Sequence, residues 1–320
     1  MAMSKTTRRR VKKTATLLFF TAVIVLLVLY ASKLDWEEIG TLLRDYDRRA
    51  LLGAGALVAV SYLLYGCYDL MARRWCHHKL AAPQVMLVSF ICYAFNLTLS
   101  TWIGGIAMRY RLYSRLGLNN QTITRIFSLS IATNWIGYLF LGGILFASGQ
   151  VVPPSHWYVS GSWLQASGII LLALVAAYLW GCAFARRRHV SLRGHRFELP
   201  DWKFAMLQIA VSSLNWMTMG TIIWLLLDYR VDYFFVLGVL LVSSIAGVII
   251  HIPAGIGVLE AVFLALLASQ PVSRGMIIAA LLAYRVLYFI LPLLLALLGY
   301  LWLEGRAKSL RSRNQQKLSG

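Results

Sequence analysis

Long apolar runs separated by short polar segments make up most of the chain. A helix that crosses a bilayer needs about 20 predominantly apolar residues, and several runs reach that length. The pattern therefore predicts an all-α polytopic membrane protein. The predicted helical segments lie near residues 15–31, 51–72, 84–102, 123–147, 163–184, 203–227, 233–250, 256–269 and 276–302.

Composition agrees with this prediction and excludes several other classes. The 320 residues are 59% hydrophobic and 13% charged, although the net charge is +19. A soluble nucleic-acid-binding protein with that charge would have far fewer apolar residues, so we expect no nucleic-acid partner. The four cysteines form no CxxC pair, and no cluster has the spacing of a metal site. We therefore expect no metal and no cofactor.

The distribution of Lys and Arg predicts the orientation. Basic residues concentrate in the N-terminal tail, in alternate loops and in a basic tail at 303–320. The positive-inside rule places these segments in the cytoplasm, together with both termini. Four acidic residues are assigned to the same side, namely Asp69, Glu198, Asp201 and Glu304.

This orientation requires two segments to enter and leave the membrane on the same side. Segment 84–116 lies between two cytoplasmic loops, and segment 233–269 lies between two external loops. We interpret both as re-entrant helical hairpins. Each contains residues that interrupt helices, and such backbone is tolerated in a bilayer only where protein or a polar cavity surrounds it. The predicted helix-break residues are Gly104 and Gly105 in the first hairpin and Pro253, Ala254, Gly255 and Gly257 in the second.

Matching segments recur at an interval of about 150 residues. The interval divides the chain into two membrane repeats, residues 1–150 and residues 151–320. Each repeat would contain three transmembrane helices and one re-entrant hairpin. Because three crossings are an odd number, the second repeat would be inverted relative to the first. Inverted repeats with broken helices are typical of transporters.

Glu260 and Arg285 are charged residues within apolar segments. A charge near the bilayer centre costs about 2.5–3.5 kcal/mol on insertion scales, so we expect these two side chains to pair. The pair would either fix helix packing alone or form a substrate or proton site between the repeats.

Further polar residues complete the candidate binding site. A half-helix beginning near Gly255 and Gly257 would point free backbone N–H groups at an anion. Arg109 could bind a phosphate bidentately, or could anchor the cytoplasmic end of its helix. Asn134 is a candidate ligand or an interhelical contact. His251, with Glu260, is a candidate proton or polar relay; a histidine here could equally bond only to its neighbours.

Two stretches of the chain resemble a known family. The run from Ile252 to Glu260, with Pro253, Gly255 and Gly257, resembles the P-G-G-x-G-x-x-E motif of the lysylphosphatidylglycerol synthase transmembrane-region family. Ala254 occupies a position where that family often has glycine. Tyr284 and Arg285, followed by Pro292, are similar to the family's last helix. The stretch from Gly104 to Arg109 is similar to its earlier G-G-x-x-x-R motif.

The resemblance implies a flippase-like module in a bacterial inner membrane. In the family, such a module moves aminoacylated phosphatidylglycerol between leaflets. Synthesis of the lysyl lipid is not implied, because these 320 residues contain no soluble segment of domain size. The expected function is translocation of an anionic phospholipid, with membrane phospholipid as the main partner and a lipid synthase, such as a cardiolipin synthase, as a second one.

Two other functions remain open at this stage. One is a non-transporting lipid-binding scaffold for a lipid synthase or an envelope complex, and the other is an ion-coupled solute carrier. An enzyme is not expected, because the chain contains no nucleophile triad, phosphate loop or zinc motif. The sequence leaves the oligomeric state open.

Overall fold

The computed structural model describes residues 46–99, 101–151, 161–184, 189–192, 195–198, 200–250, 255 and 257–319, together with residues 25, 37, 41 and 44. The chain divides into two compact units, Met1–Asp45 and Tyr46–Gly320. In the first unit the four described residues are helical, and most of the membrane segment predicted at 15–31 lies outside the described residues. The predicted repeat boundary at residue 150 stays a prediction, since Tyr46–Gly320 forms one compact unit.

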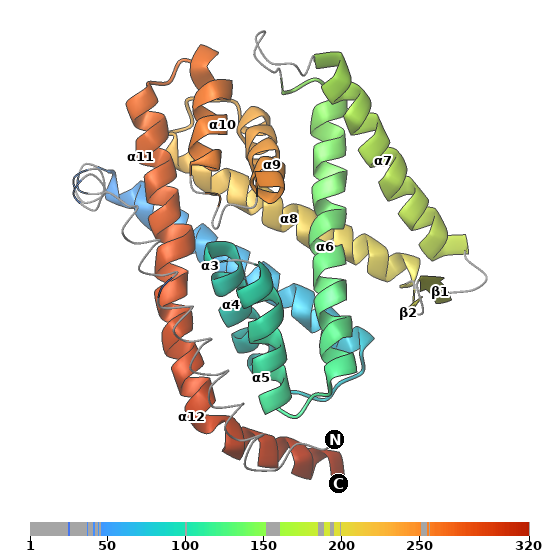
Figure 1. The fold of residues 1–320 in the computed structure, drawn as a ribbon. Coiled ribbons are helices and arrows are strands. Elements are labelled where there is room, and N and C mark those ends of the chain that lie inside the picture. The colour runs from blue at the N-terminus through green and yellow to red at the C-terminus, as the bar shows by residue number, and fades with distance from the viewer. Residues whose placement is uncertain are drawn as a thin grey trace. The chain divides into compact units, whose positions relative to one another are not determined.

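The second unit is built almost entirely of helices (Figure 1). Its helices are α3 (Arg48–Trp75), α4 (Ala82–Thr98), η1 (Thr101–Met108), α5 (Arg109–Arg115), α6 (Asn120–Ala147), α7 (Gly161–Phe184), α8 (Trp202–Leu226), α9 (Tyr233–Ile250), α10 (Val258–Leu266), η3 (Leu267–Ser269), α11 (Arg274–Arg285), η4 (Val286–Ile290) and α12 (Leu291–Ser319). Between α7 and α8, strands β1 (His189–Leu192) and β2 (His195–Glu198) pair antiparallel, with His189 opposite Glu198.

Helix boundaries follow local capping chemistry. The side chains of Asp47, Asn119 and Ser273 accept hydrogen bonds from backbone N–H groups in the first turns of α3, α6 and α11, at 3.0, 2.8 and 3.2 Å. These bonds satisfy donors that a helix start leaves free. Pro83 lies in the first turn of α4, where its missing N–H costs nothing.

Six helices of the described part are long and apolar enough to cross a membrane. They are Arg48–Trp75, Asn120–Ala147, Gly161–Phe184, Trp202–Leu226, Tyr233–Ile250 and Arg274–Arg306. The prediction of a helical, polytopic membrane protein is thereby confirmed for these segments. The inverted relation of two halves and the re-entry of the hairpins into the bilayer stay predictions.

Two pairs of consecutive helical elements pack against each other. η1 packs along α4, and α10 packs along α9 (Figure 1). The shorter apolar helices Ala82–Thr98 and Val258–Ser269 belong to these two pairs. Each pair therefore folds back on itself within an apolar stretch.

The turn in the first pair differs in detail from the prediction. α4 ends at Thr98, and Gly104 and Gly105 lie inside the π-helix η1 instead of in the break itself. A Cβ placed on Gly104 would lie 1.9 Å from the backbone nitrogen of Asn96. The backbones of η1 and α4 can approach this closely only at a glycine. Gly104 therefore serves the contact between the two elements and not the turn.

The last membrane helix contains a second π-helical segment. η4 (Val286–Ile290) separates Arg285 from Pro292 in one continuous helical path. Proline cannot donate to the preceding turn, and its ring crowds that turn. A wider π turn before Pro292 relieves this conflict, and π segments in helices often occur at functional sites.

Candidate functional site

Arg285 and Glu260 form a two-point ion pair. Arg285, at the end of α11, is 1% exposed. Its Nη2 donates to Glu260 Oε2 at 2.8 Å, and its Nε donates to Glu260 Oε1. The same Nη2 also donates to the carbonyl oxygen of Gly255 at 3.1 Å. The predicted pairing of these two charges is therefore confirmed.

The glycine turn before α10 positions Glu260. Gly255 and Gly257 have φ values of +58° and +82°, a region that side-chain-bearing residues rarely adopt. The N–H of Gly257 donates to Glu260 Oε2 at 2.9 Å, so Glu260 caps the helix that it belongs to. The Glu260 side chain is 21% exposed, against 2% for that of Arg285. The ion pair thus has one accessible member.

Three of the residues predicted for this site, His251, Pro253 and Ala254, lie outside the described residues. The expected relay role of His251 and the break roles of Pro253 and Ala254 stay predictions.

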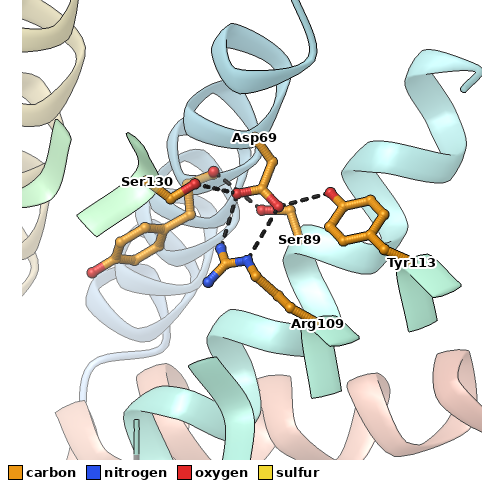
Figure 2. A network of polar contacts seen from close by, with 6 residues as sticks. Asp69, Ser89, Arg109, Tyr113 and Ser130 are labelled. Carbon is orange, nitrogen blue, oxygen red and sulfur yellow. Dashed lines mark hydrogen bonds and ion pairs between the residues drawn. The ribbon is translucent and has the colours of Figure 1, made fainter. Parts of the chain in front are cut away.

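Arg109 lies in a second buried ion pair, which the sequence analysis missed (Figure 2). Its Nη2 donates to Asp69 Oδ1 at 2.9 Å. Tyr113 donates its hydroxyl to Asp69 Oδ2, and Ser130 donates to Asp69 Oδ1, each at 2.8 Å. Arg109 is 2% exposed and Asp69 is 0% exposed. Every oxygen of this carboxylate is therefore engaged by helices other than its own.

Asp69 was counted above as a cytoplasmic charge, yet it has no exposed surface. It lies in α3, within the apolar run predicted at 51–72. The signal that identified Glu260, one carboxylate inside an apolar run, is also present here. The proximity of basic residues at 73–79 concealed it, because the residue could be grouped with a charged loop.

A series of aromatic rings in mutual contact connects the two ion pairs. The Arg109 guanidinium carbon lies 4.8 Å from the first ring centroid, and that of Arg285 lies 5.9 Å from the last. Successive centroids between them are 4.1, 6.2, 5.7 and 5.7 Å apart. The last three separations lie within the range typical of aromatic pairs. The rings are those of Tyr93, Tyr65, Tyr62, Tyr288 and Phe289.

Intramembrane amides have different surroundings. Asn215 is fully buried and accepts a hydrogen bond from Ser61 at 2.6 Å, so it ties α8 to α3. The backbone oxygen of Asn134 accepts from Ser212 at 3.0 Å. The Asn134 side-chain oxygen is buried and has no hydrogen-bond partner among the described residues. Its expected role as a substrate ligand stays a prediction.

His78 lies in the turn after α3, edge-on to the ring of Tyr113, with centroids 6.4 Å apart. Burial, and next the charge of Arg73, lowers the pKa of His78 from 6.5 to about 4. Between these two values the unfolded chain binds a proton that the folded chain does not. Stability is therefore complete above pH 6.5 and falls as the pH drops toward 4.

Replacing His78 by glutamine is expected to flatten this acid-side loss of stability. Unfolding temperatures measured from pH 7 down to the folded-state pKa of His78, about 4, would fall less steeply in the variant. His77, which is exposed, provides the control, because His77→Gln should keep the wild-type slope. If the unfolding temperature depended on pH equally in wild type and His78→Gln, His78 would not cause the acid-side loss of stability.

Among the described residues, no group of three or more His, Cys, Asp or Glu side chains could hold a metal ion. The chemistry available at the two ion pairs is that of guanidinium groups, carboxylates and hydroxyls. Guanidinium groups bind anions, and carboxylates and hydroxyls can take part in proton transfer.

Comparison with known proteins identifies the family and several relatives of this chain. A family model described as the lysylphosphatidylglycerol synthase TM region matches residues 15–296. The chain is 66% identical over 315 residues to the inner membrane protein YbhN of Escherichia coli (strain K12). This match covers 98% of the chain and 99% of that protein. It is 27% identical over 263 residues to the protein slr0712 of Synechocystis, covering 81% of this chain and 80% of the relative.

A more distant relative is a named lipid-modifying enzyme. The chain is 22% identical over 292 residues to the phosphatidylglycerol lysyltransferase of Bacillus subtilis. The match covers 87% of this chain but 33% of that enzyme. With six candidate spans and a near relative named for the inner membrane, the chain is an inner-membrane protein. It belongs to the lysylphosphatidylglycerol synthase TM region family.

Proposed function

We propose that this protein is a flippase-like translocator of an anionic phospholipid. The observation that carries the proposal is the Glu260–Arg285 pair beside a glycine turn. The Arg285 side chain is 2% exposed and the Glu260 side chain is 21% exposed. A charged pair in an apolar protein segment is costly, and packing alone could be achieved with apolar side chains. Binding of a transported anion would account for a charged pair at this position.

The chemistry of the pair suits a phosphodiester. Arg285 donates to both oxygens of the Glu260 carboxylate, and a phosphate offers the same two-oxygen face to a guanidinium. A head-group phosphate would take the place of the carboxylate on Arg285. Since two anions at one cation leave a net negative charge in a low-dielectric site, Glu260 would bind a proton as the phosphate arrives.

The proposed architecture uses both helical pairs. The α4–η1 and α9–α10 pairs would be re-entrant hairpins of two inverted repeats, one beside each buried arginine. Arg109 would contact phosphate in the first repeat, Gly255 and Gly257 would supply backbone N–H groups, and Asn134 and His251 would line the path. Both termini would be cytoplasmic. The enzyme named phosphatidylglycerol lysyltransferase shares this region, which supports phosphatidylglycerol as the lipid to test first.

Leaflet exchange of labelled phosphatidylglycerol in proteoliposomes tests the proposal. We expect Arg285→Gln to lower the rate about tenfold or more, since a charge-assisted hydrogen bond to the phosphate contributes about 1.5–3 kcal/mol. Glu260→Gln should lower the rate as well, because a neutral side chain cannot displace the phosphate from Arg285 and release of the lipid would be slow. Arg230→Gln is the control, because Arg230 forms an exposed pair with Asp228, with side chains 57% and 65% exposed. It should exchange lipid at the wild-type rate.

Wild-type rates equal to those of protein-free liposomes would contradict translocation. Retention of a lipid synthase on the purified protein without exchange would instead favour the scaffold. Uptake of a soluble substrate driven by an ion gradient would favour the solute carrier. In the proposal the chain itself is not an enzyme.

A further inference from the structure

A third charged group lies where α5 meets α12. Arg111 Nη2 and Arg115 Nη2 form ion pairs with the same oxygen, Glu304 Oε1, at 3.2 and 2.6 Å. The other oxygen, Glu304 Oε2, is buried and has no hydrogen-bond partner among the described residues. A single carboxylate oxygen therefore serves two guanidinium groups, a weaker arrangement than the two-point pair of Arg285.

An aromatic ring on α12 flanks this group. The Arg111 guanidinium carbon lies 5.9 Å from the ring centroid of Tyr300. Two arginines and one glutamate leave the group with an excess of positive charge. We call it the α5–α12 cluster, which consists of Arg111, Arg115, Tyr300 and Glu304.

The cluster is more accessible than the Asp69–Arg109 pair. The side chains of Arg111, Arg115 and Glu304 are 18%, 43% and 24% exposed. These values allow a ligand to reach the guanidinium groups with small side-chain movements. The side chains of Asp69 and Arg109 are 0% and 2% exposed, so a ligand could reach Arg109 only after the surrounding helices move.

The location of the cluster at the end of a membrane span indicates which ligand it binds. Glu304 and Arg306 lie at the end of the membrane span Arg274–Arg306, the level at which lipid phosphates meet water. Tryptophan is enriched at this level, and basic side chains there are attracted to anionic lipids. Further basic residues follow in the chain at Lys308, Arg311, Arg313 and Lys317. A phospholipid phosphate fits this position better than a soluble anion, which has no reason to be concentrated at the bilayer.

We propose that the α5–α12 cluster is a docking site for the phosphate of an anionic phospholipid at the leaflet surface. The phosphate oxygens would occupy the position between Arg111 and Arg115 that Glu304 Oε1 holds in this structure. Glu304 is then a competitor of the lipid. The site would load the translocation path, and in that respect the inference rests on the proposed function.

Competition by Glu304 leads to a test in which two variants change binding in opposite directions. Full-length protein is placed in phosphatidylcholine nanodiscs doped with phosphatidylglycerol, and native mass spectrometry measures the phosphatidylglycerol retained. We expect Glu304→Gln to increase retention about fivefold, because both arginines keep their charge and lose their competitor. The double variant Arg111→Gln/Arg115→Gln should lower retention about tenfold. Arg230→Gln should leave it unchanged.

A purely structural ion-pair cluster would respond differently. Every variant would then weaken the contact between α5 and α12, and retention would fall or stay constant in all of them. Lower or unchanged retention in Glu304→Gln would therefore overturn the proposal. Because Glu304→Gln keeps both arginines, its result stands even if the double variant fails to fold.

Two further measurements separate the sources of phosphate and the two proposals. Inorganic phosphate added to the nanodiscs should not displace phosphatidylglycerol; displacement would overturn the lipid assignment in favour of a soluble anion. The docking proposal concerns equilibrium binding, so it survives if Glu304→Gln raises retention while Arg285→Gln leaves leaflet exchange unchanged. That second result would sink only the proposed translocation.

Discussion

Replacing Asp69 by asparagine is expected to lower the free energy of unfolding of this protein by about 3–5 kcal/mol. The change keeps the shape of the side chain but leaves Arg109, whose side chain is 2% exposed, without its counter-charge. It also weakens the bonds that Tyr113 and Ser130 donate to the carboxylate. Thermal unfolding of the purified protein in detergent measures the loss.

A double variant shows whether the unpaired charge causes the loss. Asp69→Asn/Arg109→Gln removes both charges and should be more stable than Asp69→Asn alone, because no ion is left buried without a partner. Asp228→Asn breaks an exposed pair and should cost less than about 1 kcal/mol. If Asp69→Asn unfolded at the wild-type temperature, the described network would not contribute to stability.

Replacing Gly104 by alanine is expected to cost about 3 kcal/mol or more, at the upper end of what overpacking costs. The added Cβ would lie 1.9 Å from the Asn96 nitrogen and 2.3 Å from the Phe95 carbonyl carbon. Both are backbone atoms, so no rotamer change relieves the contact. η1 would have to separate from α4, and the Arg109 that follows η1 would move away from Asp69.

Gly55→Ala is the matched control for this second prediction. Gly55 also lies within a helix, and a Cβ there would have nothing within 4 Å. Alanine has the higher helix propensity, so stability should rise by up to about 1 kcal/mol. Unfolding temperature and yield of the folded protein report both variants. Equal stability of Gly104→Ala and Gly55→Ala would show that α4 and η1 do not approach as closely as described.

The helical elements could be predicted from the pattern of apolar residues. The runs at 163–184, 233–250 and 123–147 coincide with α7, α9 and α6 to within a few residues. This success has a simple cause, since a backbone in an apolar environment must satisfy its own hydrogen bonds and does so as helix. The glycine turn at Gly255 and Gly257 was also predictable, because few other residues adopt positive φ.

The partners of charged residues were only partly predictable. Glu260 and Arg285 lie in neighbouring segments, and each interrupts an apolar run, so the sequence pointed to both members of the pair. Asp69 and Arg109 are separated by a complete helix, α4, and both lie close to basic loops. Their pairing depends on how α4 and η1 fold back beside α3, which no local pattern specifies.

The sequence by itself thus determined the membrane class, the helical segments, the glycine turn and one charged pair, because burial in lipid and backbone geometry act locally along the chain. The tertiary structure alone decided that Asp69 neutralises Arg109, that aromatic rings connect the two arginines, and that Arg111 and Arg115 share Glu304. These contacts join residues from different helices. Their energies depend on distance and burial, which exist only once the helices have packed.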